Sequence, residues 1–507
     1  MAPDVRDRLV AFFESHQKLV EADALELLLR QPRPLIASRE VLERMGVGEP
    51  FVTSELVRST LTLLRPSRIG AELSLEVRPP TPPSSAGDAS PAEPFRLIRQ
   101  GFVAPTPNTP PLDGYRRLFA NRFERLREML KGRPTLENLR SAHEIERSGE
   151  AASLIAMVRS VRSTARQHHL ILTLEDETGC IEAFLPKEAP GAAEPILPDE
   201  VIGVRLEFGR DPSRLPRITT LERPDVPWRR KVQRSDTSNR ALFLSDLHVG
   251  SKAFLADAWG RLVDFLKGAG PHPDLARTIR YVVVAGDLVD GIGIYPHQER
   301  DLAIPDVVEQ YAELGRRLSE LPSSVTIVVV PGNHDAVCPA EPQPALSPPL
   351  CERLGPNVRP LANPSTFSLE GVVVEAYHGR SLDDLIPSIP GASYSRPTEV
   401  MARMLRMRHL APSYGGRTPL APTPVDGLVV DPLPDILAMG HAHTFGVERY
   451  RGVLLLNVST WQAETEYQRM RNITPVPARA VLVDLSTLGV TSIDCTSSEA
   501  VVAATSL

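Results

Sequence analysis

The feature that most constrains the fold is a series of apolar segments, each followed at once by aspartate, histidine or asparagine. Continuous apolar segments predict strands that are buried on both faces of a sheet. Helical patterns at 256–266 and 305–321 separate some of these segments, which indicates a layered α/β domain. The five segments are 241–244, 281–285, 325–330, 372–376 and 436–439, followed by Ser245-Asp246-Leu247-His248, Gly286-Asp287-Leu288-Val289-Asp290, Pro331-Gly332-Asn333-His334-Asp335, Tyr377-His378-Gly379 and Gly440-His441-Ala442-His443.

These polar side chains are expected to meet, because open α/β sheets hold their sites beyond the carboxyl ends of the strands. Carboxylates and imidazoles together are typical ligands of divalent transition metals. A carboxylate shared by two ions allows two-metal chemistry, in which the ions polarise a phosphate and lower the pKa of bound water. Each motif alone is weak, since such residue pairs also occur in surface loops. Their joint occurrence, in order and each at a strand end, predicts a metal-dependent phosphoesterase.

The order of the motifs, DxH, GDxxD, GNHD, H and GHxH, resembles that of the calcineurin-like metallophosphoesterase superfamily over about residues 240–460. The resemblance implies two divalent metal ions, with Mn preferred and Fe, Zn, Ni or Mg as alternatives that the sequence does not separate. It implies that one ion is held by Asp246, His248, Asp287 and His443, and the other by Asp287, Asn333, His378 and His441.

The same resemblance implies roles for three residues that do not bind metal. His334 is expected to stabilise or protonate the leaving oxygen of the phosphate ester. Asp335 is expected to orient His334 through its other ring nitrogen, and Asp290 to support the ligands from behind, as carboxylates around metal sites do.

Longer segments resemble the small-subunit family of archaeal D-family DNA polymerases. They are Ala285–Pro296, Tyr377–Asp384 and Arg408–Pro419. This resemblance implies a 3′–5′ exonuclease that proofreads for a large catalytic polymerase subunit, in a heterodimer. The expected substrate is DNA with a single-stranded or frayed 3′ end, and the complex also allows contact with the sliding clamp. One local difference is His297, which we interpret as a surface histidine rather than a contact near the metals.

The chain is expected to divide into several parts. Residues 1–75 predict a small helical domain, with helices over 5–29, 38–45 and 53–64. Residues 76–112 predict a Pro-rich flexible linker. Residues 113–145 predict a basic helical connector whose arginines form either a solvated face or a contact with DNA or an acidic partner. Short segments of alternating apolar and polar residues in 146–225 predict the strands of an OB-fold barrel. Residues 236–495 are expected to form the phosphoesterase domain. A strand-like segment at 478–485 either completes a sheet or serves a partner.

Composition limits the class of protein. Hydrophobic residues make up 42% and charged residues 24%, as in ordinary globular proteins. No apolar segment reaches the roughly 18 residues of a membrane span, and the charged N-terminus is unlike a signal peptide, so we expect a cytoplasmic protein without membrane contact. The four cysteines lack metal-knuckle or disulfide spacing.

The net charge of −6 gives no general affinity for nucleic acid, so DNA contact must come from local basic segments. Arg380, Arg403, Arg406, Arg408 and Arg417 are candidates for DNA contact, and Trp228-Arg229-Arg230-Lys231 is a second basic cluster. The alternative for both is salt bridging to acidic parts of the same chain.

Two other functions remain open on the residues. An autonomous phosphoesterase or repair nuclease would need neither the helical domain nor the barrel. A catalytically silent, architectural polymerase subunit is the second alternative, and the intact set of ligands counts against it.

Overall fold

The computed structural model describes residues 94–105, 109–164, 169–210, 215–470 and 473–505, with residues 19–29, 51–54 and a few single positions before residue 58. The chain separates into two compact units, residues 1–84 and 85–507. Among the described residues, no helix has the length and apolar character needed to cross a membrane.

The first unit has a small core of its own, built from apolar residues such as Leu9, Phe13, Leu25 and Leu28. Helix α2 (Ala22–Leu29) follows strand β1 (Leu19–Val20), which pairs in parallel with β2 (Phe51–Val52). A single helix through 5–29 is therefore wrong at residues 19–20. The apolar residues there form a strand instead, in which Val20 pairs with Val52.

The second unit contains a closed five-stranded barrel, as the alternating segments predicted. Residues on alternate positions, such as Leu172 and Leu174, fill its interior. Helix α6 starts with a capping box between Ser141 and Glu144. The elements are α6 (Ala142–Ser148), β4 (Ala152–Ser163), β5 (Leu170–Asp176), β6 (Gly179–Leu185), β7 (Val201–Glu207) and β8 (Arg217–Glu222), closed in the order β4-β5-β6-β8-β7.

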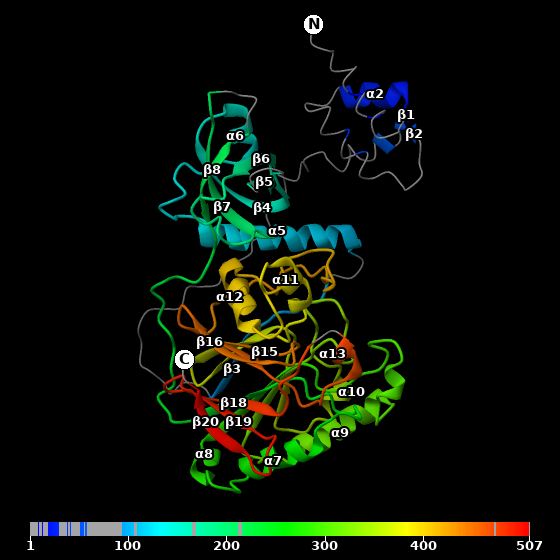
Figure 1. The fold of residues 1–507 in the computed structure, drawn as a ribbon, viewed down its shortest axis with the longest axis vertical. Coiled ribbons are helices and arrows are strands. Elements are labelled where there is room, and N and C mark those ends of the chain that lie inside the picture. The colour runs from blue at the N-terminus through cyan, green and yellow to red at the C-terminus, as the bar shows by residue number, and fades with distance from the viewer. Residues whose placement is uncertain are drawn as a thin grey trace. The chain divides into compact units, whose positions relative to one another are not determined.

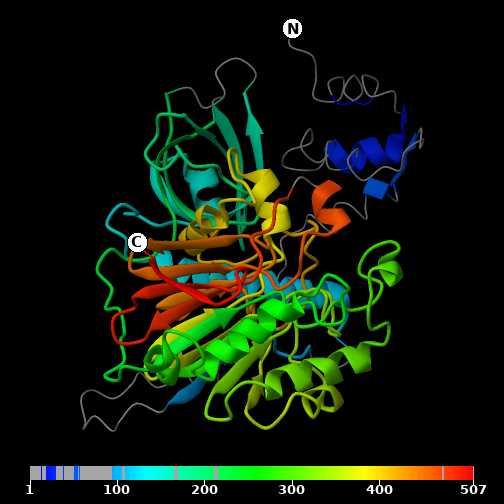
Figure 2. The same cartoon turned by 60° about the horizontal axis from the view of Figure 1, so that its bottom comes forward.

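The rest of the unit consists of two sheets packed face to face, with helices outside them (Figures 1 and 2). The first sheet has the order β12 (Val358–Pro360), β11 (Thr326–Val330), β10 (Ile279–Ala285), β9 (Arg240–Leu244), β18 (Arg479–Asp484), β19 (Val490–Asp494) and β20 (Val501–Thr505). The second has the order β16 (Phe445–Tyr450), β17 (Val453–Val458), β15 (Ile436–Met439), β14 (Val372–Ala376), β13 (Ser365–Leu369) and β3 (Phe95–Gln100).

Apolar side chains fill the space between the two sheets, among them Phe243, Val283, Phe367 and Val374. The outer faces are covered by helices, so the central strands of both sheets are buried on both sides. The predicted layered α/β domain is thereby confirmed. The helices are α7 (Ala256–Leu266), α8 (Pro273–Arg277), α9 (Val307–Ser319) and α10 (Pro348–Cys351) near the first sheet, α11 (Leu382–Ser388) and α12 (Pro397–Met407) on the second, and the short α13 (Glu466–Met470).

The C-terminal segment completes the first sheet. Strand β18 pairs antiparallel with β9, and β19 and β20 add to it. The domain therefore extends past residue 495, to Thr505.

Part of the predicted flexible linker is structured. Strand β3 pairs antiparallel with β13, and Arg99 forms an ion pair of 2.7 Å with buried Glu375. The Pro-rich composition of 76–112 hid this strand, whose hydrogen-bond partners lie far along the chain. Residues 76–93 lie outside the described residues.

Helix α5 (Pro111–Leu130) confirms the helix predicted in the basic connector, but one of its faces is buried rather than solvated. It lies between the barrel and the α11–α12 layer (Figure 1). Arg122 is fully buried, with Nε 2.7 Å from Asp426 Oδ2 and Nη1 donating to the carbonyl of Pro412. Arg125 donates to the carbonyl of Asp426. These arginines join the helix to the phosphoesterase-like layers, while Arg116 and Arg117 are exposed.

Candidate metal centre

The loops after β9, β10, β11, β14 and β15 bring the predicted side chains together. Their strands run parallel within each sheet, so the carboxyl ends lie along one edge. Three groups of side chains at this edge have donor atoms close enough to hold a metal ion, and one of them is His248, Asp290 and His334. The other two match the predicted ligands and are called the metal groups below. The groups are Asp246, His248 and His443, and Asp287, His378 and His441.

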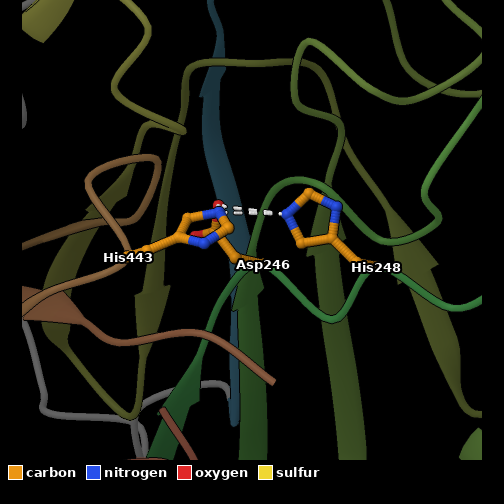
Figure 3. Close-up of side chains that lie close together, drawn as sticks. All are labelled: Asp246, His248 and His443. Carbon is orange, nitrogen blue, oxygen red and sulfur yellow. Dashed lines mark hydrogen bonds and ion pairs between the residues drawn. The ribbon is translucent and has the colours of Figure 1, made fainter. Parts of the chain in front are cut away.

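In the first group, Asp246 faces two imidazoles (Figure 3). Its Oδ1 lies 3.1 Å from Nε2 of His443 and 3.8 Å from Nε2 of His248. The two Nε2 atoms are 3.1 Å apart, and Oδ1 of Asp246 is buried without a hydrogen-bond donor. A buried acceptor with no donor, beside two ring nitrogens that face each other, is a donor set that fits a cation.

Asp287 lies between the two groups. Its Oδ2 is 3.3 Å from Nε2 of His378 and 3.8 Å from Nε2 of His248. Nε2 of His378 is also 3.0 Å from Oδ1 of Asn333. In this structure Nε2 of His441 is 3.3 Å from Oδ2 of Asp383 on α11, a residue the sequence did not single out. The predicted shared carboxylate thus occupies the position that joins both groups.

The backbone at the site is unusual, because five of these residues have left-handed dihedral angles. Non-glycine residues there are strained by roughly 1–2 kcal/mol each, and such strain gathers at functional sites. The sharp turns aim successive side chains inward, and Gly332 and Gly440 leave room for them, since a Cβ on either would collide with Asp287 or with Ser245 and Asp246. The φ angles are 52° at Asp246, 50° at His248, 48° at Asp287, 66° at His441 and 55° at His443.

Three glutamines that the sequence did not single out support the histidines from behind. Asp290 Oδ1 accepts a hydrogen bond from Nδ1 of His248 at 3.1 Å. The amides of Gln298 and Gln462 both donate to the carboxylate of Asp290. Gln468 bonds Nδ1 of His443. No motif marks these glutamines, and only their position in the fold identifies them.

The structure corrects the predicted role of Asp335. Nδ1 of His334 donates to the backbone carbonyl of Asp290 at 2.7 Å, so Asp290 fixes this ring. The carboxylate of Asp335 instead accepts from the amides of Gly332 (2.8 Å) and Leu288 (3.1 Å) and from the hydroxyl of Tyr311. Asp335 is adjacent in sequence to His334, but its side chain turns toward the two loop backbones and holds them together.

Buried charges at the site compensate one another. Burial opposes the charged form of His248, but the carboxylates of Asp246 and Asp290 outweigh it and raise the pKa to about 10. Burial also opposes the charged form of His378, but the carboxylate of Asp287 outweighs it and raises the pKa to about 9. Burial and the charge of Asp287 raise the pKa of Asp335 to about 6. Metal binding would therefore release protons from these imidazoles.

Known proteins resemble this chain along most of its length. The DNA polymerase II small subunit of Archaeoglobus fulgidus is 41% identical over 72% of this chain and 73% of its own length. This chain belongs to the family of DNA polymerase II small subunits. The small subunit of Pyrococcus furiosus is 36% identical over 75% of this chain and 63% of its own length. The family model for the B-subunit of DNA polymerases alpha and epsilon matches residues 241–447. Among solved structures, vacuolar protein sorting 29 of Cryptosporidium parvum is 18% identical over 53% of this chain and 98% of its own, with a TM-score of 0.27.

A cavity of about 240 Å³ in this polymerase small subunit is lined by residues of both candidate metal-binding groups. Arg380 lines it and donates to the carbonyl of Pro339. Arg417 is exposed nearby. Burial opposes the charged form of Asp383, but the charge of His441, with a smaller contribution from Arg417, outweighs it and lowers the pKa of Asp383. His297 is exposed beside Glu299 and does not line this cavity. The remaining lining residues include His248, Asp287, Asp290, Asn333, His334, Asp383, Tyr394, His441 and His443.

Three of the arginines predicted to contact DNA have other partners. Arg403 is buried and joins α12 to the barrel through Glu194 at 2.7 Å and Glu200 at 3.1 Å. Arg406 bonds the hydroxyl of Tyr450 and pairs with Glu194. Arg408 is buried and donates to the carbonyl of Val430. For these three the alternative, salt bridging and hydrogen bonding within the chain, is the correct one.

Replacing Arg403 by glutamine should therefore lower stability and leave DNA affinity unchanged. We expect a loss of about 2 kcal/mol, because buried hydrogen bonds to charged groups disappear and Glu194 loses a partner. Urea unfolding of the full chain and binding to a fluorescent oligonucleotide check the two parts. Arg396→Gln is the matched control, since Arg396 is exposed and its partners, Glu399 and the carbonyl of Gly391, lie within five residues of it in the chain. Weaker DNA binding with unchanged stability would restore Arg403 as a DNA contact.

Proposed function

We propose that this chain is the proofreading 3′–5′ exonuclease subunit of a two-subunit DNA polymerase, hydrolysing the terminal phosphodiester of single-stranded or frayed 3′ ends. The observation that carries the proposal is the position of Asp287 between two groups of metal-binding side chains at one cavity. Membership in the polymerase small-subunit family supports the assignment to replication.

The side chains fit two divalent ions. Asp246, His248, Asp287 and His443 would hold one, and Asp287, Asn333, His378 and His441 the other. Imidazole, carboxylate and amide ligands suit Mn, Fe, Zn or Ni, and we favour Mn, with Mg as a further alternative. When bound, such a pair polarises the phosphate and supplies a water of lowered pKa.

His334 is the group placed to assist the leaving oxygen. Its Nδ1 is fixed on the carbonyl of Asp290, so Nε2 is the nitrogen left for the substrate. Its ring lies edge-on to His248, with centroids 4.7 Å apart, and it lines the cavity. Since Nδ1 carries the hydrogen of the neutral ring, Nε2 bears a proton only in the imidazolium form, and from that form it would donate this proton to the departing 3′ oxygen. Arg380, and Arg417 outside the cavity, would hold the phosphates of the approaching strand.

The proposed partner is a large catalytic subunit, in a heterodimer that is required for DNA synthesis. Through that complex the chain would also contact the sliding clamp. The support is that the relatives of this chain are small subunits of a polymerase, which implies a larger one. A purely architectural role would not account for the candidate metal ligands that gather at the cavity. A nuclease acting without the partner would show the same activity with and without it.

The polarity of cleavage tests the proposal. With Mn²⁺, an oligonucleotide labelled at its 5′ end should shorten one nucleotide at a time, and a paired 3′ end should resist more than a single-stranded one. Asn333→Ala and His334→Ala should each reduce the rate by about a hundredfold or more, as expected for loss of a group acting on the reacting atoms. Their binding to the large subunit should be unchanged. A wild-type complex without nuclease activity would favour the architectural role.

A further inference from the structure

One surface far from the metal centre has the side chains of a nucleic-acid contact. Trp228 is 81% exposed, whereas Trp259 and Trp461 are buried. It lies in the segment 223–239 between the barrel and the two-sheet domain. An exposed aromatic side chain is common when it stands alone, so its meaning depends on the groups that surround it.

The indole is held in place from one side. The guanidinium of Arg451 lies 4.0 Å from the centre of the Trp228 ring. Arg451 itself is fixed by an ion pair of 2.8 Å with Asp225 and by a hydrogen bond to the carbonyl of Val226. A cation packed on one ring face leaves the ring in a defined orientation, with most of its area open to a second flat group.

The residues after Trp228 present positive charge to solvent. Arg230 and Val232 face the domain, because Arg230 pairs with buried Asp435 and Val232 packs against the core between the sheets. The alternate residues Arg229 and Lys231, and then Arg234, are exposed and have no ion pair within the described part of the chain. The alternation over residues 229–232 is the period of an extended chain, and Trp228 and Arg234 are exposed on either side of it.

Further cations gather around this segment. Burial and the neighbouring charge of Arg234 lower the pKa of Arg449. A cavity of about 280 Å³ beside Trp228 is lined by Arg133, Arg223, Arg406 and Arg451, against Glu194, Glu222 and Asp225. Nε of buried Arg223 has no hydrogen-bond acceptor there. Three of these arginines are ion-paired, Arg223 with Glu200, Arg406 with Glu194 and Arg451 with Asp225. The positive charge that this surface presents to solvent therefore comes from Arg229, Lys231 and Arg234.

The surface lies at the opposite edge of the second sheet from the metal centre. Strand β17 runs parallel to β15. Arg451 precedes the start of β17, and Asp435 precedes the start of β15, whereas His441 follows the end of β15. This surface is therefore separate from the arginines at the catalytic cavity.

We propose that Trp228, Arg229, Lys231 and Arg234, the Trp228 strip, bind single-stranded nucleic acid. A base stacks on the open face of Trp228, and the three cations pair with backbone phosphates. Stacking on aromatic rings between cations is the recognition mode of single strands, and it needs no sequence preference. An acidic protein segment would use the cations but would gain little from the open face of the indole.

Intrinsic fluorescence tests the proposal on the full chain, because Trp228 is the one tryptophan of the three that solvent reaches. We expect an oligothymidylate of about 20 nucleotides to quench it in EDTA at low salt. By fluorescence anisotropy of a labelled strand, Trp228→Ala should weaken binding about tenfold, and Trp228→Phe less. Arg229→Gln with Lys231→Gln should reduce the slope of log affinity against log salt by about 1.4.

The matched control is Lys267→Gln with Arg277→Gln, two exposed cations elsewhere, which should leave affinity and slope unchanged. Absence of quenching, or equal affinity of wild type and Trp228→Ala, would overturn the proposal. Quenching by polyglutamate as strong as that by oligothymidylate would assign the strip to an acidic protein partner instead. Since EDTA prevents cleavage, the result does not depend on whether the chain is a nuclease.

Discussion

Replacing Asp287 by asparagine is expected to lower nuclease activity by about a thousandfold or more and to release metal from both groups. Each ion contributes several kcal/mol to catalysis, and about 1.4 kcal/mol corresponds to a factor of ten. Asp287 is the carboxylate that reaches both groups, with Oδ2 near His378 and His248. Asparagine has similar volume and keeps an acceptor for the amide of His334, which Oδ1 now binds at 2.8 Å. The fold should therefore survive the change.

Metal content by mass spectrometry and degradation of single-stranded DNA measure the two effects together. The comparison with His334→Ala is the informative one, because that variant should lose activity and keep its metal. Asp257→Asn on the exposed side of α7 is the control for loss of a negative charge. If Asp287→Asn retains both ions and activity within about threefold of wild type, the shared-carboxylate arrangement is wrong.

The largest effect on stability is expected at Arg122 of α5. Its guanidinium and the carboxylate of Asp426 are both fully buried, 2.7 Å apart, and His409 also bonds Asp426 at 3.0 Å. Arg122→Ala leaves the Asp426 charge buried with its main partner removed. Breaking a buried pair from one side costs about 3–5 kcal/mol, because the remaining charge stays out of water.

Urea unfolding of the full chain measures this loss, followed on the transition of the unit that contains α5. Arg116→Ala on the same helix is the matched control. Arg116 is exposed and lies 3.8 Å from Asp113, so its loss should cost less than about 1 kcal/mol. Adding Asp426→Asn to Arg122→Ala should recover part of the stability, because no unpaired charge then remains. A loss below about 1 kcal/mol for Arg122→Ala would mean that α5 is not anchored by this pair.

The strands that carry the ligands could be predicted because their signals are local. Each is a short apolar segment that ends in a polar motif, and the structure places Asp246, Asp287, Asn333 and His378 at the ends of β9, β10, β11 and β14. Strand β3 could not be predicted, because its pairing with β13 joins residues about 270 positions apart within a Pro-rich region. Its apolar alternation is too short to stand out.

The arginines also show what could not be predicted from the sequence. Arg403, Arg406 and Arg408 look alike in sequence to Arg417, yet the first three turn toward Glu194, Tyr450 and Val430. The sequence gives the charge of an arginine but not the direction in which its side chain points. Whether it meets phosphate or a carboxylate of the same chain depends on which acidic residue the fold places beside it.

The sequence by itself determined which side chains gather at the candidate site and which sheet edge carries them, since strand and motif are adjacent in the chain and the geometry of a parallel sheet aligns the ends. Support of a ligand by Asp290 was predicted from sequence, and its carboxylate does bind His248. Only the tertiary structure decided the rest: the carbonyl of Asp290 fixes His334, Asp335 binds loop backbones, and Gln462 and Gln468 complete the set. Hydrogen bonds between side chains depend on angstrom-scale distances between segments far apart in sequence, and no local pattern encodes those distances.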